Sequence, residues 1–370
     1  MMRRSAIIVG LMGMLVSIVN CVRVLADVDW DPTIFTAFGV EATPTREYAE
    51  TRLGEVFLRP EQGHDGKFFF VQANDPWVNH PEENALVLDR PLYRSQRMLY
   101  PVLAGGGGLF GPLTIVWSML LVNLLAMGVG TWAVARIAID MGGSPWWGLA
   151  FALNLGFINE VNIGGAGVIA AAAAFCGVLA IMRSSLSVGI VLLVLAALAR
   201  EAMLIAAAGI ALWLWFEGRR ADAALTAGIP ALAVTAWGAY LRWRIGVGAA
   251  AAQVEEIGWP FVGFVEAFGG WLGDPFDLAV GVAIMILFIV FTRRVLISNR
   301  PVGWAFLGFV ALGVVFTEQV WHSYFDITRA VAPIITSFAL VVFVGPAASG
   351  AGDGERPGKD SSSDRVWKSE

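Results

Sequence analysis

The chain has 370 residues, of which 57% are hydrophobic and only 15% charged, and its formal net charge is −5. A soluble domain averages about 25% charged residues because its surface must be polar. Here the mean hydropathy is +0.68 and the apolar residues come in long runs, which favours a lipid bilayer as the solvent. The sequence has no basic cluster of the size needed to bind a phosphate backbone, so we expect no nucleic-acid partner. Cys21 and Cys176 lie in apolar runs and are predicted to be buried apolar side chains rather than a disulfide or metal pair.

Ten apolar segments are predicted to cross the bilayer as helices, for which roughly 20 residues are needed. In chain order they lie near residues 5–25, 110–135, 145–158, 163–182, 186–199, 202–216, 223–241, 277–292, 302–317 and 330–346. The fold class expected is an all-α polytopic membrane protein with about 10 transmembrane helices, in a range of roughly 8 to 11. Short or broken helices are tolerated where their backbone is buried in protein or lines a wet cavity.

The positions of arginine predict an orientation with both termini inside. Arg3 and Arg4 precede the first span, and ten spans return the chain to the same side. Residues 1–26 are expected to form the first transmembrane helix, although the pattern also fits a signal peptide. Residues 27–109 are expected to form an outer loop with amphipathic helices and a re-entrant piece at 97–109. Residues 110–346 form the predicted transmembrane bundle, and 347–370 a disordered cytoplasmic tail.

The outer loop holds the first candidate for chemistry. Residues 45–58 predict an amphipathic helix, and Asp65 is placed to begin a second helix that ends at Asp75 and the following proline. One interpretation of Asp65 is an N-cap whose carboxylate bonds the free amides of the first turn. The other is a general base at the membrane surface, where Gly63 and Gly66 would let a substrate approach closely.

Ionisable residues at the predicted outer ends of the helices form a second group of candidates. Such residues are expensive near membrane depth and usually face a bundle interior or a cavity. Arginine offers phosphate a bidentate donor pair, and two arginines three residues apart can share one helix face. Arg200 and Arg329 have a second interpretation as helix-locking salt bridges, and a lone histidine is commonly structural. The group is Asp65, Asp75, Arg94, Arg97, Glu160, Arg200, Glu201, Glu318, His322, Asp326 and Arg329.

No cofactor is predicted with any specificity. His64 and His80 have carboxylates nearby, but their spacing matches no recognised ligand motif. We therefore assign no metal ligand, and a divalent cation remains an alternative.

Three short motifs resemble a known pattern. HDGKFFF at residues 64–70, NDP at 74–76 and YRSQRMLYP at 93–101 are similar to the first outer loop of a group of bacterial multi-pass proteins. In those proteins the loop reads roughly Tyr-Asp-Gly-Gln-Phe-Tyr-Tyr, then Asp-Pro, then Tyr-Arg-x-x-Arg-Ile-Leu-Tyr-Pro. Here His64 stands for the usual aromatic residue and Lys67 for the usual glutamine. The layout resembles that of the C-type glycosyltransferase (GT-C) superfamily.

The resemblance implies an inverting hexosyl- or pentosyltransferase in a bacterial-type plasma (inner) membrane, with its active face outward. Its donor would be a polyprenyl-phosphate sugar and its acceptor a glycan, lipid or protein. Asp65 would be the base, with Asp75 as second carboxylate. Arg94, Arg97, Arg200, Arg329 and His322 would bind phosphate, supported by His64, Gly66, Glu160, Glu201 and Asp326. Two alternatives stay open: a transporter or flippase for a lipid-linked or small polar solute, and a non-catalytic GT-C-like assembly subunit.

Overall fold

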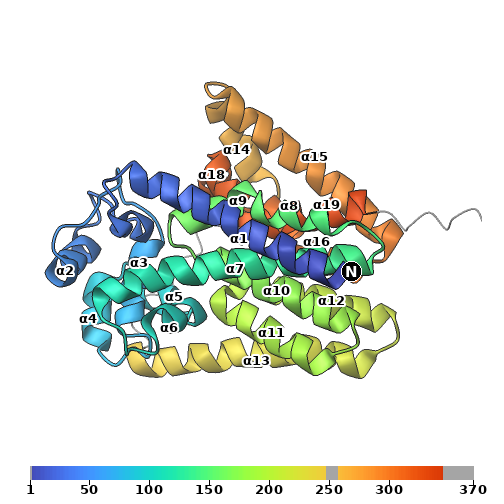
Figure 1. Cartoon of the computed structure of the whole chain (residues 1–370), viewed down its shortest axis with the longest axis horizontal. Helices are drawn as coiled ribbons and strands as arrows, with labels where there is room; N and C mark the ends of the chain where they lie inside the picture. The colour runs from blue at the N-terminus through green and yellow to red at the C-terminus, as the bar shows by residue number, and fades with distance from the viewer. Residues whose placement is uncertain (1, 247–256, 345–370) are drawn as a thin grey trace, which may run out of the picture.

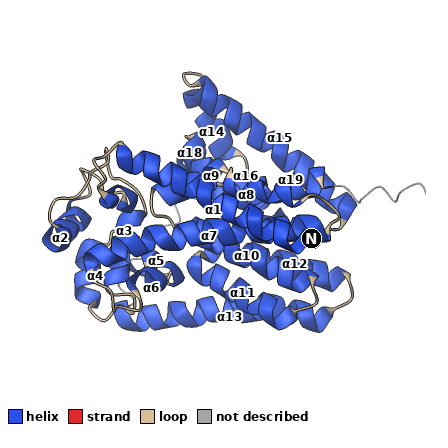
Figure 2. Ribbon diagram, viewed as in Figure 1, coloured by secondary structure: helices blue, strands red, loops and turns tan. Residues whose placement is uncertain are grey.

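The computed structural model describes residues 2–246 and 257–344, and in these ranges the chain is helical, with no β-strand (Figure 2). The predicted tail at 347–370 lies outside the described residues. The helices are α1 (Met2–Ala26), η1 (Pro32–Thr36), α2 (Thr43–Leu53), α3 (Gly66–Asn74), α4 (Pro81–Val87), α5 (Pro91–Arg94), α6 (Leu99–Gly105), α7 (Pro112–Asp140), η2 (Pro145–Gly148), α8 (Leu149–Ala152), α9 (Leu155–Asn162), α10 (Gly167–Met182), α11 (Leu186–Ala199), η3 (Glu201–Met203), α12 (Leu204–Phe216), α13 (Arg220–Ile245), α14 (Val262–Trp271), α15 (Pro275–Ser298), α16 (Pro301–Val315), α17 (Glu318–Trp321), α18 (Tyr324–Ala330) and α19 (Ala332–Phe343).

Several of these helices are suited to a bilayer. In the described ranges four are long and apolar enough to cross it, namely Arg4–Ala26 of α1, α7, α13 and α15. The pair α18 and α19 makes a fifth if its two helices, bent by 64°, count as one span. Four further apolar segments, in α10, α11, η3–α12 and α16, are shorter. The chain is therefore a helical protein of membrane type, and the larger count of ten spans remains a prediction.

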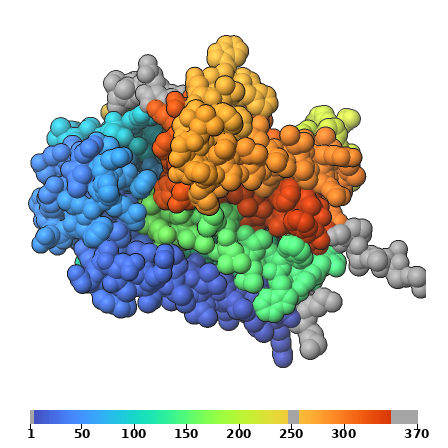
Figure 3. All heavy atoms as spheres, turned by 90° about the horizontal axis from the view of Figure 1, so that it is seen from above, coloured from blue at the N-terminus to red at the C-terminus, as the bar shows by residue number. Residues whose placement is uncertain are grey.

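The bundle is arranged around α7, which runs through its length (Figure 1). Helix α1 lies along one side of α7 and α10 along another, and α11, α12, α13 and α16 continue outward from α10. A side chain at Gly13 of α1 would collide with Thr131 of α7, so glycine allows the two backbones to approach closely. Helix α15 extends from the bundle, and in the space-filling view α14 and α15 (orange) form a raised block (Figure 3).

Residues 27–109, called the first-loop region below, fold into helices with an apolar core of their own. Phe38, Tyr48, Phe70 and Tyr100 are buried together in this core, which rests on Met119 of α7. Helix α2 ends at Leu53, five residues before the predicted boundary, because Gly54 takes a backbone conformation with φ of 83°. Helix α3 has the predicted extent, and α6 with its following turn occupies the stretch predicted to be re-entrant.

One predicted span, at residues 145–158, is broken, and the predicted span at 330–346 begins at a sharp bend between α18 and α19. Residues 145–158 form η2, α8 and the start of α9, because the Asn154 side chain accepts a bond from the Gly156 amide at 3.0 Å and begins a new helix. Its Nδ2 donates to the Ala332 carbonyl at 2.8 Å, so the polar break is satisfied inside the protein. Helix α9 packs against α18, just before the bend into α19. These two breaks bring Glu160 and Arg329 together.

Candidate functional site

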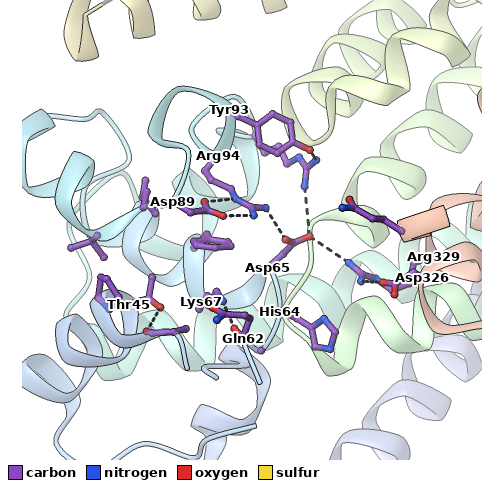
Figure 4. A pocket seen from close by; sticks show the side chains of 18 of the residues that line it. Thr45, Gln62, His64, Asp65, Lys67, Asp89, Tyr93, Arg94, Asp326 and Arg329 are labelled. Carbon is purple, nitrogen blue, oxygen red and sulfur yellow. Dashed lines mark hydrogen bonds and ion pairs between the residues drawn. The ribbon is translucent and has the colours of Figure 1, made fainter. Parts of the chain in front are cut away.

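A cavity of about 490 Å³ lies between the first-loop region and one end of the bundle (Figure 4). The first-loop region supplies one wall, and the junction of α11 with η3 and the helices α17 and α18 supply the other. Its surface is mainly polar and carries more positive than negative side chains. The charged residues that line it are Asp65, Lys67, Asp89, Arg94, Arg97, Arg200, Asp326 and Arg329.

Asp65 stands at the centre of this group. It occupies the N-cap position of α3, as the sequence predicts, but its side chain makes no capping hydrogen bond. The carboxylate turns instead toward three guanidinium groups (Figure 4). One oxygen lies 2.9 Å from Nη1 of Arg94, and the other lies 3.4 Å from Nη2 of Arg329 and 3.7 Å from Nη1 of Arg97. Of the two interpretations of Asp65, the capping bond is not observed.

Each of the two first-loop arginines is held by a second carboxylate. Asp89 binds Arg94 through two bonds of 2.9 Å. Glu201 binds Arg97 through bonds of 3.2 Å and 3.0 Å. The predicted sharing of one helix face is wrong, because α5 ends at Arg94 and Arg97 lies in the irregular segment between α5 and α6. Both side chains nevertheless reach Asp65.

The bundle supplies the third arginine and its support. Arg329 donates to Glu160 at 3.1 Å and to Asp326 at 3.2 Å, besides its contact with Asp65. Glu160 is 3% exposed, receives Arg200 at 3.4 Å, and accepts the Gly167 amide at 3.0 Å. A buried carboxylate with this many donors is a structural anchor that orients two guanidinium groups. Arg200 and Arg329 therefore take part both in helix-locking salt bridges and in the lining of the cavity.

Asp75, His322 and Gly66 neither line the cavity nor bind one of its arginines. Asp75 closes α3 and accepts bonds from the amides of Asn79 and His80, so its carboxylate holds the next turn. His322 is mostly exposed and lies 3.8 Å from Asp326. Gly66 is buried, and a side chain there would collide with the Ile163 carbonyl oxygen, so this glycine serves close backbone packing rather than substrate approach.

His64 does line the cavity, and its ring lies 4.9 Å from that of Phe325. Burial lowers the pKa of His64, and the charges of Arg329 and Arg59 lower it further, which favours a neutral ring at pH 7. A neutral histidine beside the arginines adds no positive charge to the site.

The sequence-based prediction missed three residues that belong to the site. Asp89 fixes Arg94, Tyr93 accepts a bond of 2.8 Å from Arg97, and Lys67 lines the cavity. Asp89 lies five residues before Arg94, in the bend that precedes α5, and no regular helix favours pairing at that separation. Of these three residues, only Lys67 was marked in the sequence, because it replaces the glutamine of the resembling motif.

The charges of the site determine its chemistry. Burial alone would raise the pKa of Asp65, but Arg94, Arg97, Arg329 and Arg200 hold it below its usual range, so the carboxylate stays ionised. The arginines can bind an oxyanion in bidentate fashion. Among the described residues, no group of three or more His, Cys, Asp and Glu side chains is arranged to hold a metal ion.

No protein-family model, curated protein or solved structure matches this chain. Its function is therefore inferred from the residues of the cavity. They place the ionised carboxylate of Asp65 among four guanidinium groups at the end of an apolar helical bundle.

Proposed function

We propose that this chain is a membrane glycosyltransferase that moves a sugar from a polyprenyl-phosphate donor to an acceptor on the outer face. The observation that carries the proposal is the cavity in which Asp65 faces Arg94, Arg97 and Arg329 within 4 Å. It offers a base and the cations that a phosphate leaving group requires. Arg200 lines the same cavity and adds a fourth guanidinium group.

The proposed reaction is a single displacement. Asp65 takes the proton of an acceptor hydroxyl, and that oxygen attacks the anomeric carbon of the sugar. The bond between this carbon and the phosphate oxygen breaks, and the polyprenyl phosphate leaves with the electron pair. The arginines stabilise the charge that develops on the phosphate. A single displacement of this kind, with Asp65 as the base, inverts the configuration at the sugar carbon.

The arginines that lower the basicity of Asp65 are also the groups that a phosphate would engage. When a donor phosphate shares their hydrogen bonds, less positive charge is directed at the carboxylate, and its proton affinity rises. The base would therefore become effective when the donor is bound.

An apolar groove beside the arginines supports a lipid donor. It has a volume of about 460 Å³ and is lined by Met98, Leu198, Trp237, Tyr240 and Trp77, with small alanines between them. Met98 follows Arg97 in the chain, and Leu198 lies two residues before Arg200. A molecule with an anionic head in the cavity and a hydrocarbon tail in this groove would fit both surfaces.

The broken helices favour a second candidate, a transporter for a lipid-linked or small polar solute. Transporters commonly build their sites from interrupted helices, and here α8–α9 and α18–α19 are interrupted. A transporter would need the arginine cavity to bind its solute, but it would not need Asp65 as a base.

The test compares the wild-type chain with Asp65→Asn and with Asp140→Asn, a control at the far end of α7. Membranes that contain each form receive polyprenyl phosphates carrying a labelled hexose or pentose, with cell-envelope material as acceptor. We expect transfer by the wild type and the control, and a loss of about 100-fold or more for Asp65→Asn. The proposal is refuted if Asp65→Asn accumulates normally and transfers label at the wild-type rate, or if the chain drives solute uptake and transfers no sugar.

A further inference from the structure

The cavity has two chemically different ends, with Asp65 between them (Figure 4). At one end lie the arginines held by bundle carboxylates, including Arg329 with Asp326. At the other end lie Lys67, Gln62 and Thr45, all from the first-loop region. A reaction centred on Asp65 would therefore have a donor on one side and an acceptor on the other.

Lys67 is the unusual charge at the second end. It is 4% exposed, and its ammonium group donates to the Gln62 carbonyl and lies 4.8 Å from the centre of the Phe68 ring. Five cationic residues line the cavity, and each of the four arginines has a carboxylate within 4 Å. Lys67 forms no such ion pair with any residue that the structure describes.

A buried ammonium group without a counter-ion is unfavourable, because one carbonyl and one ring replace only part of its hydration. Burial lowers the pKa of Lys67, and the nearby Arg94 lowers it further, against the opposing charges of Asp89 and Asp65. An anion entering this end of the cavity would supply the missing charge and the remaining hydrogen-bond acceptors.

We infer that Lys67 binds an anionic group of the acceptor, a carboxylate or a phosphate, and so selects an acidic acceptor for the proposed transfer. The inference rests on the proposed function, since it assigns the arginine end to the donor phosphate. It also gives a physical role to the position where the resembling proteins carry glutamine. A glutamine could bind a neutral hydroxyl there, whereas a buried lysine favours a negative charge.

The experiment uses the purified full chain and measures binding by calorimetry. Farnesyl phosphate, a short prenyl phosphate, first occupies the arginine end. Three probes that differ only in the group at sugar carbon 6 are then added: methyl glucoside uronate, which has a carboxylate there, the 6-phosphate of methyl glucoside, and neutral methyl glucoside. We expect one of the anionic probes to bind about tenfold or more tightly than the neutral one. Whether the carboxylate or the phosphate binds more tightly identifies the acceptor group.

Variants separate this inference from the proposed function. Lys67→Gln should remove the preference for the anionic probe, and Lys67→Arg should retain part of it, while both still bind farnesyl phosphate. If the wild type binds charged and neutral probes equally, or if Lys67→Gln keeps the preference, the inference is wrong. If farnesyl phosphate does not bind, or binds equally to Arg97→Lys, the donor assignment and the proposed function fail instead.

Discussion

Arginines at the two ends of the bundle are used differently. At the end remote from the first-loop region, Arg183 binds Asp140 and Arg219 binds Asp222, each as a separate pair (Figure 1). The side chain of Arg183 is 36% exposed there. In the cavity the side chain of Arg329 is 10% exposed and contacts three carboxylates, those of Asp65, Glu160 and Asp326.

This difference shows that burial changes the role of arginine. An exposed arginine pair is screened by water and contributes little to stability. A buried arginine must be compensated, and here each one that faces Asp65 is compensated from behind by a further carboxylate. That arrangement keeps the guanidinium groups directed at the cavity even when Asp65 is not their partner. Three predictions test the contrast, from the largest expected effect to the smallest.

The largest effect is expected for Glu160→Ala. The substitution removes a carboxylate that is 3% exposed and leaves Arg329 and Arg200 without their anchor. Breaking a buried ion pair from one side costs about 3–5 kcal/mol. The thermal unfolding temperature in detergent, followed by tryptophan fluorescence, should fall sharply, and little protein should remain monodisperse. Normal thermal stability would mean that Glu160 is not the anchor of the bundle side of the cavity.

A smaller effect is expected for Arg97→Lys, which keeps the charge but not the two-pronged geometry. Glu201 holds the Arg97 guanidinium group through two nitrogens, and a lysine can satisfy only part of that arrangement. We expect binding of farnesyl phosphate to weaken by about tenfold while the chain still folds. Calorimetry measures this, with Arg183→Lys at the far end as the matched control. Equal affinities for both variants would remove Arg97 from the phosphate site.

The smallest effect is expected for Asp140→Asn. Its partner Arg183 is partly exposed, and surface pairs of this kind contribute about 0.2–1 kcal/mol. The unfolding temperature should change by only a few degrees at low salt, and by less at high salt, because ions screen the pair. A loss comparable to that of Glu160→Ala would contradict the contrast between the two ends.

Part of the site could be predicted from local sequence. Asp65 begins α3 as its spacing indicates, and the motif at residues 93–101 puts two arginines in the same first-loop region. Asp75 shows the limit of such reasoning. It belongs to the NDP motif of the same resembling pattern, yet its carboxylate accepts bonds from the amides of residues 79 and 80 in the turn that follows α3.

By itself, the sequence determined that the protein is helical and apolar. A long hydrophobic run in a bilayer must satisfy its backbone polar groups internally, and a helix does so. It also indicated where α3 starts, because Asp65 occupies the predicted N-cap position even though its side chain makes no capping bond. Only the tertiary structure decided that Asp65 meets Arg329, 264 residues further along the chain, and that Lys67 lies in the same cavity without an ion pair of its own among the described residues. Those contacts depend on the breaks before α9 and between α18 and α19. Breaks of this kind are stable only when neighbouring helices form hydrogen bonds with the polar groups at the break, as Asn154 does with the Ala332 carbonyl. The local sequence does not show which helices will be those neighbours.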